Sequence, residues 1–433
     1  MKKIIFILIL IFVLILGGIG YYVYINNGNQ SVNPGEIFKN VKNFFPFGTP
    51  SVQVEQNATN TSSGTIRNQT EQPKQQDRMF KISEAPVSGF VTKDITSTST
   101  ELFFNKEKNA TTSTTTKQTE TFIEFIERAT GHIFEYKLSN QEKNRISNTT
   151  IPKVYNAYLN SKGTEFITQT LSDENINTEY RKIMFATTTG TSTDTQKLNT
   201  LSKSVFYPYN TDIIIAKGDF VFYTTKTANG SIGYISGFEN KKPIQIFSTP
   251  LREIGAIWSG GDIVEIFNKP HSEYEGISFS VDIKKKTIKQ TITGINGLTA
   301  SPNTDGTYIL YNSNIGNLSL SSKKLSSNTD NFLNLKTLPE KCVWSKKNTK
   351  IIYCAVPVFV ENTGYPEKWY QGIVSFNDEF WSINVETGDK YLVYSPKNDK
   401  KDSPDATNLT LNNKENYLFF TNKKDLSLWG VSL

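Results

Sequence analysis

The chain offers few side chains that could act as a catalytic base. Its 433 residues include only two histidines, His132 and His271. His132 stands at a turn before an apolar run and His271 follows Pro270 in a polar segment, so both suit structural or exposed positions. A hydrolase serine would lie in a Gly-x-Ser-x-Gly elbow, and the sequence contains none. These residues therefore argue against a serine hydrolase.

Paired carboxylates are a second source of chemistry, because two acids flanking a glycosidic bond can cleave it when they stand about 5–9 Å apart. The sequence does not show which two carboxylates would stand at this separation. It also lacks the sialidase box Ser-x-Asp-x-Gly-x-x-Trp, since Asn303 stands where the aspartate belongs. A glycan-active enzyme that uses loop carboxylates is kept as an alternative. Its candidate acids are Asp173, Glu174, Glu265, Glu273, Glu275, Asp378 and Glu379.

No pattern predicts a metal, a cofactor or a nucleic-acid partner. Calcium loops and phosphate-binding loops are missing, and two cysteines alone are too few ligands for zinc. The formal net charge is only +6, and the densest basic run is Lys284–Lys286. A nucleic-acid-binding protein would carry a basic stripe or a larger cluster. We therefore expect no catalytic residue, no cofactor and no metal site.

Cys342 and Cys354 are the only cysteines, and they flank a polar turn at residues 346–349. Strand-like residues on both sides predict a hairpin centred at residue 348, which would place the two cysteines opposite each other. Directly opposed Cβ atoms in a sheet lie about 4.5–5.5 Å apart, near bridging distance. Outside the cytoplasm this arrangement favours a disulfide, which in so short a loop would contribute at most about 3 kcal/mol. Two buried free thiols are the alternative.

Residues 4–25 form an uncharged apolar stretch, long enough to cross a membrane core of about 30 Å as a helix. Lys2 and Lys3 precede it and no Lys or Arg follows before Lys39, which predicts a cytoplasmic N-terminus. A cleaved signal peptide would have a shorter apolar region of about 7–15 residues. We therefore predict that residues 1–25 are a cytoplasmic tip and an uncleaved single-pass anchor, with the rest extracytoplasmic.

Residues 26–78 are rich in Asn, Gln, Ser and Thr. Such a segment buries too little apolar surface to offset the entropy of ordering, so we expect a flexible linker. Its root-mean-square span as a coil would be about 40 Å. Phenylalanines cluster at 36–48, where they would lie on the membrane surface or pack on the folded part.

From residue 79 the chain consists of short runs rich in Ile, Val, Phe, Tyr and Thr, separated by polar turns. This texture predicts an all-β fold. A strand, a polar turn and a second strand recur with a period of roughly 40–50 residues, typical of a four-stranded propeller blade. The clear copies are 157–170, 256–268, 298–312, 342–355 and 409–422, the degenerate copies are 90–105 and 206–225, and insertions are expected at 109–120 and 361–379.

These turns resemble the WD40-like (PD40) repeats of the TolB type, whose blades carry a turn written roughly Trp/x-Ser-Pro-Asp-Gly-Lys-x-Ile/Leu-x-Tyr. No copy here has an intact Ser-Pro-Asp-Gly. The resemblance covers about residues 79–433, leaves no room for the N-terminal domain of the TolB protein, and implies a fold without implying an activity. The matches are Ser301–Gly306, Trp258-Ser259, and Trp344-Ser345 followed by Ile351-Ile352-Tyr353.

The last repeat has only three strands, which would leave an open sheet edge. Residues 78–83 can supply the fourth strand and so join both ends of the chain in one blade. Seven blades over residues 79–433 would average about 51 residues each, a reasonable blade length. We predict a seven-bladed β-propeller behind the transmembrane helix and disordered linker, with six or eight blades left open.

The expected insertion at 361–379 contains Tyr365, Trp369 and Tyr370. The other four tryptophans occupy strand positions that suit packing between blades, so this loop is the best candidate for an aromatic contact surface. We expect a non-catalytic binding or scaffold module for a protein or a cell-envelope polymer. Besides the glycan-active enzyme, the alternative is a structural subunit of an envelope complex, whose span 4–25 packs on a partner helix through its glycines.

Overall fold

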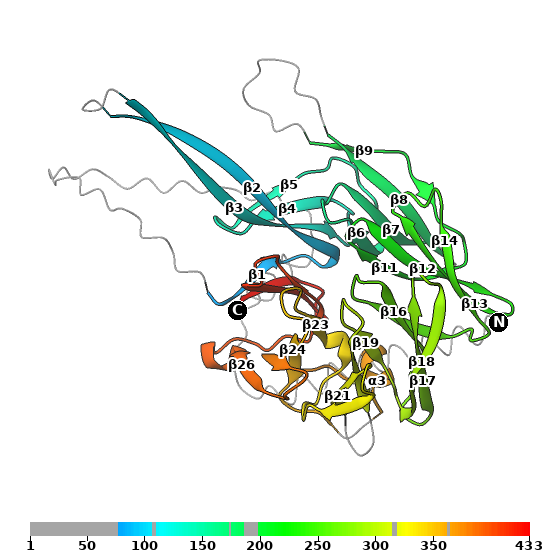
Figure 1. Cartoon of the computed structure of the whole chain (residues 1–433). Coiled ribbons are helices and arrows are strands. Elements are labelled where there is room, and N and C mark those ends of the chain that lie inside the picture. Colours follow the sequence, from blue (N-terminus) through cyan, green and yellow to red (C-terminus); the bar gives the residue numbers. More distant parts are fainter. Residues whose placement is uncertain (1–76, 106–109, 173–174, 186–197, 314–317, 362–363) are drawn as a thin grey trace, which may run out of the picture. The chain divides into compact units, whose positions relative to one another are not determined.

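The computed structural model describes residues 77–105, 110–172, 175–185, 198–313, 318–361 and 364–433 (Figure 1). The expected anchor of residues 1–25 and all but the last two residues of the expected linker lie outside the described residues. Within the described ranges, no helix combines the length and the apolar character needed to cross a membrane.

The prediction of an all-β fold is confirmed, because the strands of the described residues form seven antiparallel sheets, six with four strands and one with five. The first three sheets are β2–β5 (Val87–Asn105, Ala110–Glu127, Ile133–Lys137, Glu142–Arg145), β6–β10 (Val154–Leu159, Glu165–Leu171, Ile176–Met184, Thr200–Leu201, Val205–Phe206) and β11–β14 (Thr211–Lys217, Phe220–Thr227, Gly230–Gly237, Ile244–Thr249).

The remaining sheets follow the same order along the chain, and the last one also takes a strand from residues 79–83. They are β15–β18 (Ile254–Trp258, Ile263–Asn268, Glu275–Asp282, Thr287–Asn296), β19–β22 (Ala300–Pro302, Tyr308–Ser313, Ser319–Lys324, Thr329–Phe332), β23–β26 (Cys342–Trp344, Ile351–Pro357, Asp378–Asn384, Lys390–Tyr394), and β27 (Ala406–Leu411), β28 (Tyr417–Asn422) and β29 (Leu428–Ser432) with β1 (Met79–Ser83). Three short helices are also described: η2 (Pro339–Lys341), α3 (Glu367–Tyr370) and η3 (Pro396–Asp399).

The second strand of a sheet is buried on both faces, whereas the outermost strand is largely exposed. In β16 the central residues Val264–Phe267 are all buried, while most of β18 is exposed. A strand that packs on both faces needs apolar residues without strict alternation, which explains runs such as Tyr417–Phe420. Each sheet therefore packs against a neighbour on both faces.

Hydrophobic clusters fill every space between consecutive sheets of the described residues, including the space between the last sheet and the first. One cluster joins β6–β10 to β11–β14 through Ile167 and Tyr223. Another joins the last sheet to β2–β5 through Phe419 and Phe125. Together with the four-stranded antiparallel sheets, this closed series of contacts fits a β-propeller.

The two ends of the described part of the chain meet in one sheet, as predicted from the missing strand. β1 pairs antiparallel with β29, with Met79 opposite Val431 and Phe80 opposite Gly430. A Cβ atom at Gly430 would lie 2.5 Å from the Phe80 ring, so glycine there makes room for that ring. The N-terminal strand therefore completes a sheet whose other strands all come from residues 406–432.

The interpretation of two degenerate repeats is wrong. Residues 90–105 do not form two strands, because β2 is continuous and pairs along its length with β3, which also takes up the expected insertion at 109–120. Threonine is β-branched and favours strands, so the Thr-rich runs extend a hairpin rather than forming a loop. In the copy at 206–225, the turn between the first two strands lies at Lys217–Phe220 rather than near Asn210.

Candidate functional site

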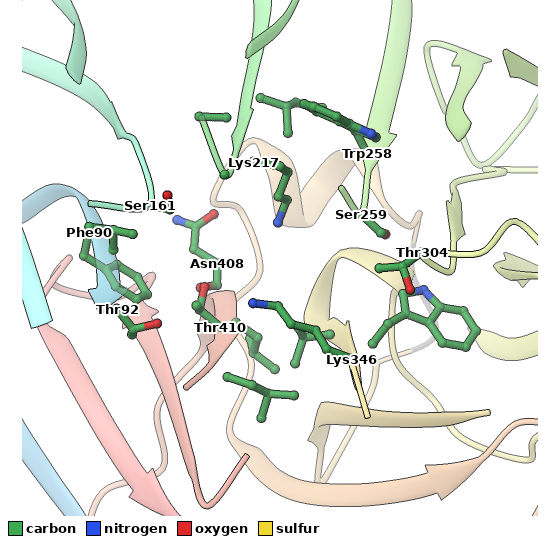
Figure 2. A pocket seen from close by; sticks show the side chains of 18 of the residues that line it. Phe90, Thr92, Ser161, Lys217, Trp258, Ser259, Thr304, Lys346, Asn408 and Thr410 are labelled. Carbon is green, nitrogen blue, oxygen red and sulfur yellow. The ribbon is translucent and has the colours of Figure 1, made fainter. Parts of the chain in front are cut away.

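A central cavity of about 750 Å³ is lined by the first strand, or the turn after it, of each sheet of the described residues (Figure 2). Ligand pockets in proteins are usually about 300–1,000 Å³. The strands that contribute are β2, β6, β11, β15, β19, β23 and β27.

An asparagine organises the turn after the first strand in three of the sheets. The Asn160 Oδ1 atom accepts hydrogen bonds from the backbone N–H groups of Thr164 and Glu165 at 2.9 and 3.2 Å. Asn303 and Asn412 accept the equivalent pair of bonds in their own turns. This side chain satisfies backbone donors that the tight turn leaves unpaired. The repeated Asn at this position is a sequence signal for these turns that lies outside the TolB-type motif.

The turns that line the cavity also contact one another. The Ser161 N–H group donates to the Gly218 carbonyl at 2.9 Å, which links the turn after β6 to the turn after β11. The Lys346 N–H group donates to Glu415 Oε1 at 2.7 Å and links the turns after β23 and β27. The Asn303 amide donates to the Thr349 carbonyl at 3.2 Å. Such contacts hold the side chains at this end of the cavity in fixed relative positions.

Two lysines point into the cavity from sheets that are not neighbours. Lys217 ends β11 and Lys346 follows β23, and Figure 2 shows both ammonium groups directed into the same open space. Neither ammonium forms an ion pair or a hydrogen bond within the described part of the chain. The pKa of the Lys217 amine is lowered, mainly by desolvation and to a lesser extent by repulsion from Lys346. This part of the cavity is therefore electropositive.

The acids that line the same cavity already have partners. Asp94 accepts a hydrogen bond of 2.6 Å from the Thr121 hydroxyl. Glu340 accepts hydrogen bonds from the hydroxyls of Tyr370 and Thr299, and its pKa is raised by desolvation. Among the described residues, four lysines line the cavity, Lys93, Lys162, Lys217 and Lys346, against these two acids, so it presents more cationic than anionic charge to a ligand.

The candidate acids for glycan cleavage are not gathered in this cavity. Asp173 and Glu174 lie outside the described residues. Of the other five, none lines the cavity among the described residues, and Glu265 and Asp378 are fully buried. Glu379 accepts a hydrogen bond of 2.7 Å from Ser395, while Glu273 and Glu275 are exposed.

Glu265 is a buried acid in β16 that has no basic partner among the described residues. Its carboxylate accepts hydrogen bonds from Ser280, at 2.6 Å, and from Thr291. Because burial penalises the charged form more than these hydroxyls stabilise it, its pKa is raised from 4.5 to about 7. Glu265 is therefore a pH-sensitive element of the core rather than a surface acid.

We expect Glu265→Gln to remove part of the pH dependence of stability. A pKa raised to about 7 means that the folded state holds a proton that the unfolded chain releases above pH 4.5. The contribution of this protonation to the free energy of unfolding is complete below pH 4.5. It is lost as the pH rises through 7, at about 1.4 kcal/mol per pH unit. The variant should gain stability relative to the wild type, by about 3 kcal/mol in total, between pH 4.5 and 7.5.

Urea unfolding curves of both proteins at pH 4.5, 6 and 7.5 would measure this difference. Glu124 and Asp378 also have raised pKa values, but they are present in both proteins and so cancel in the comparison. A free-energy difference that stays constant with pH would contradict the assignment.

The insertion between β24 and β25 buries two of the three aromatic residues expected to form a contact surface. Tyr365 and Trp369 are only 2% and 4% exposed, whereas Tyr370 is 44% exposed. The Trp369 indole N–H donates to Asp405 Oδ2 at 3.0 Å, and its ring stacks on Phe376. They are buried because Trp369 donates its hydrogen bond to this buried carboxylate and because both rings pack in one hydrophobic cluster with Leu338. A role of this loop in binding stays a prediction.

Other residues of the insertion are accessible instead. Phe359 and Ile373 are 74% and 67% exposed, and Val358 is 45% exposed. They border a second cavity, of about 550 Å³, that Tyr365 and Lys397 also line. We call Val358, Phe359 and Ile373 the insertion patch. In the sequence, the apolar run that continues past Pro357, at the end of β24, could have indicated Val358 and Phe359 as apolar residues outside the strand.

Cys342 and Cys354 lie directly opposite each other on β23 and β24. A disulfide joins them, and their Cα atoms are 4.1 Å apart. Cys342 lines the central cavity, so the bridge ties the first strand of this sheet to the second beside that cavity.

The known structures named below are distantly similar to this chain. No family model and no curated protein matches the chain, so the resemblance to TolB-type repeats stays a prediction. A functionally unknown protein from Desulfotomaculum acetoxidans is similar at 14% identity and a TM-score of 0.44, over 71% of this chain and 91% of that one. An oligogalacturonate lyase in complex with manganese is similar at 9% identity and a TM-score of 0.45, over 81% and 98%.

The tricorn protease is similar at 10% identity and a TM-score of 0.34, over 72% of this chain and 37% of that protein. Similarities this distant carry no conclusion about what the chain does.

Proposed function

We propose that this chain is a seven-bladed β-propeller of the TolB-like type that acts as a non-catalytic binding module, held on the extracytoplasmic side of a membrane by residues 4–25. The seven described sheets and the hydrophobic clusters between them support the blade number. The apolar span and the lysines before it support the anchor and its orientation.

The insertion patch is the observation that carries the binding function. Three large apolar side chains of one insertion border the same cavity, each at least 45% exposed, and such clusters on a protein surface mark contact sites. The bonds of Trp369 to Asp405, and of Asp405 to Lys341, fix the insertion to the core. A surface held in place loses little entropy on binding, so the patch suits a protein partner that presents apolar side chains.

Chemical cross-linking of the full chain in native membranes would test this proposal. We expect the double variant Phe359→Ser/Ile373→Ser to lose an adduct that the wild type forms, because the two most exposed side chains of the patch are gone. Phe332→Ser is the matched control, since Phe332 is 61% exposed on β22, outside the patch. Adducts that are the same in all three proteins would argue against this surface.

A further inference from the structure

We propose that the central cavity binds an oxyanion, a phosphate or sulfate group, between Lys217 and Lys346. This extends the proposed binding function to a second site with a different chemistry. It does not depend on the insertion patch, because none of the patch residues lines the central cavity.

The fold brings the two lysines together although they are far apart in the sequence. Lys217 is the last residue of β11, and Lys346 lies in the turn between β23 and β24. The position of Lys346 is fixed by its own N–H group, which donates to Glu415 Oε1 at 2.7 Å. The Lys217 turn is held to its neighbour by the Gly218 carbonyl, which accepts from Ser161 N–H.

The two ammonium groups form no ion pair within the described part of the chain. Lys93, a third lysine of the cavity, is neutralised by Glu124 and Glu135, each at 2.8 Å. Lys217 and Lys346 have no such partner, and their mutual repulsion contributes to the lowered pKa of Lys217. An oxyanion between the two ammonium groups would turn this repulsion into two attractions in a partly desolvated space.

Neutral hydrogen-bonding side chains surround the same space. Ser259, Thr304 and Asn408 line the cavity, and Figure 2 shows them around the two lysines. Across the described ranges, none of their side chains is engaged in a hydrogen bond. A phosphate or sulfate group accepts several hydrogen bonds at once, and lysine binds phosphate as a point charge. The side chains present therefore match an oxyanion better than a neutral ligand.

The size of the cavity leaves room for more than a single ion. At about 750 Å³ it would hold an oxyanion together with the molecule that carries it. The oxyanion could then come from a free ion, from a small ester or from a polymer with repeating phosphate groups. The test therefore includes one probe for each source.

Isothermal titration calorimetry on the detergent-solubilised full chain is the test, with inorganic phosphate, glycerol 3-phosphate and a short polyphosphate as probes. We expect at least one probe to bind, with an affinity that falls as salt is added. Lys217→Gln and Lys346→Gln should each weaken that binding by about tenfold or more, because each removes a charge-assisted contact. The probe that binds most tightly would identify the source of the oxyanion: phosphate for a free ion, glycerol 3-phosphate for a small ester, and polyphosphate for a polymer.

Lys347→Gln is the matched control. Lys347 is next to Lys346, but its ammonium donates to the Lys414 carbonyl and it does not line the cavity. The Lys347→Gln variant should bind the probes with the same affinity as the wild type. Failure of all three probes to bind, or equal weakening by the control, would overturn the site. Neither result would affect cross-linking through the insertion patch, so failure of this proposal is distinguishable from failure of the binding module.

Discussion

Replacing Lys341 with methionine is expected to lower the free energy of unfolding by about 3–5 kcal/mol. Lys341 is fully buried, and its ammonium donates to Asp378 Oδ2 at 2.8 Å and to Asp405 Oδ1 at 2.7 Å. A third bond, of 3.0 Å, reaches the Ala406 carbonyl. Without the lysine, two buried carboxylates lose their only described cation. Each must then remain charged without a compensating partner or take up a proton.

Urea unfolding followed by tryptophan fluorescence would measure the loss. Lys324→Met is the control, because Lys324 forms a 2.9 Å ion pair with Glu386 at the surface, where the two side chains are 42% and 33% exposed. Surface pairs contribute less than about 1 kcal/mol. If Lys341→Met cost no more than this control, the buried cluster would not be stabilising the fold as described.

Replacing Phe80 with alanine should have an effect of similar size, about 3–5 kcal/mol, because it removes a large side chain from a packed core. Phe80 is 9% exposed, lies in the cluster that joins the last sheet to β2–β5, and contacts the Tyr417 ring edge-on at 6.3 Å between ring centroids. It also fills the space left by the missing side chain of Gly430. The substitution therefore weakens the pairing that closes the series of sheets.

Phe206→Ala provides the comparison, since Phe206 is 64% exposed on β10 and should matter by less than about 0.5 kcal/mol. Limited proteolysis adds an independent readout, because a loosened β1 would become cleavable at Lys81 in Phe80→Ala and not in the control. Resistance of Lys81 to cleavage, together with wild-type stability, would contradict a closing role for β1.

The repeat pattern of the sequence predicted much of the fold because each sheet uses the same physical elements. Apolar runs form buried strands, polar turns separate them, and a sheet with one strand missing needs a partner such as residues 79–83. The β2–β3 hairpin could not be predicted from the same rules. Its Thr- and Ser-rich residues are polar enough for a loop and β-branched enough for a strand, and only pairing decides between the two.

The candidate sites were less predictable than the fold. Lys217 at the end of a strand and Lys346 in a turn are ordinary positions for lysine, and only the arrangement of the sheets brings their charges together. The exposure of the insertion residues also depends on tertiary contacts, since Trp369 is buried by its bond to Asp405, on the approach to β27. Nothing local to the insertion distinguishes the buried Trp369 from the exposed Tyr370 beside it.

The pairing of β1 with β29 has a consequence for how the protein is made. A ribosome adds about 5–20 residues per second, so the strand at residues 79–83 leaves it tens of seconds before residues 428–432 exist. Throughout this time the apolar strand has no sheet edge to join, and it is exposed to wrong pairings with other chains. We therefore expect chaperones to protect the nascent segment at residues 79–83 until the final strand has been synthesised.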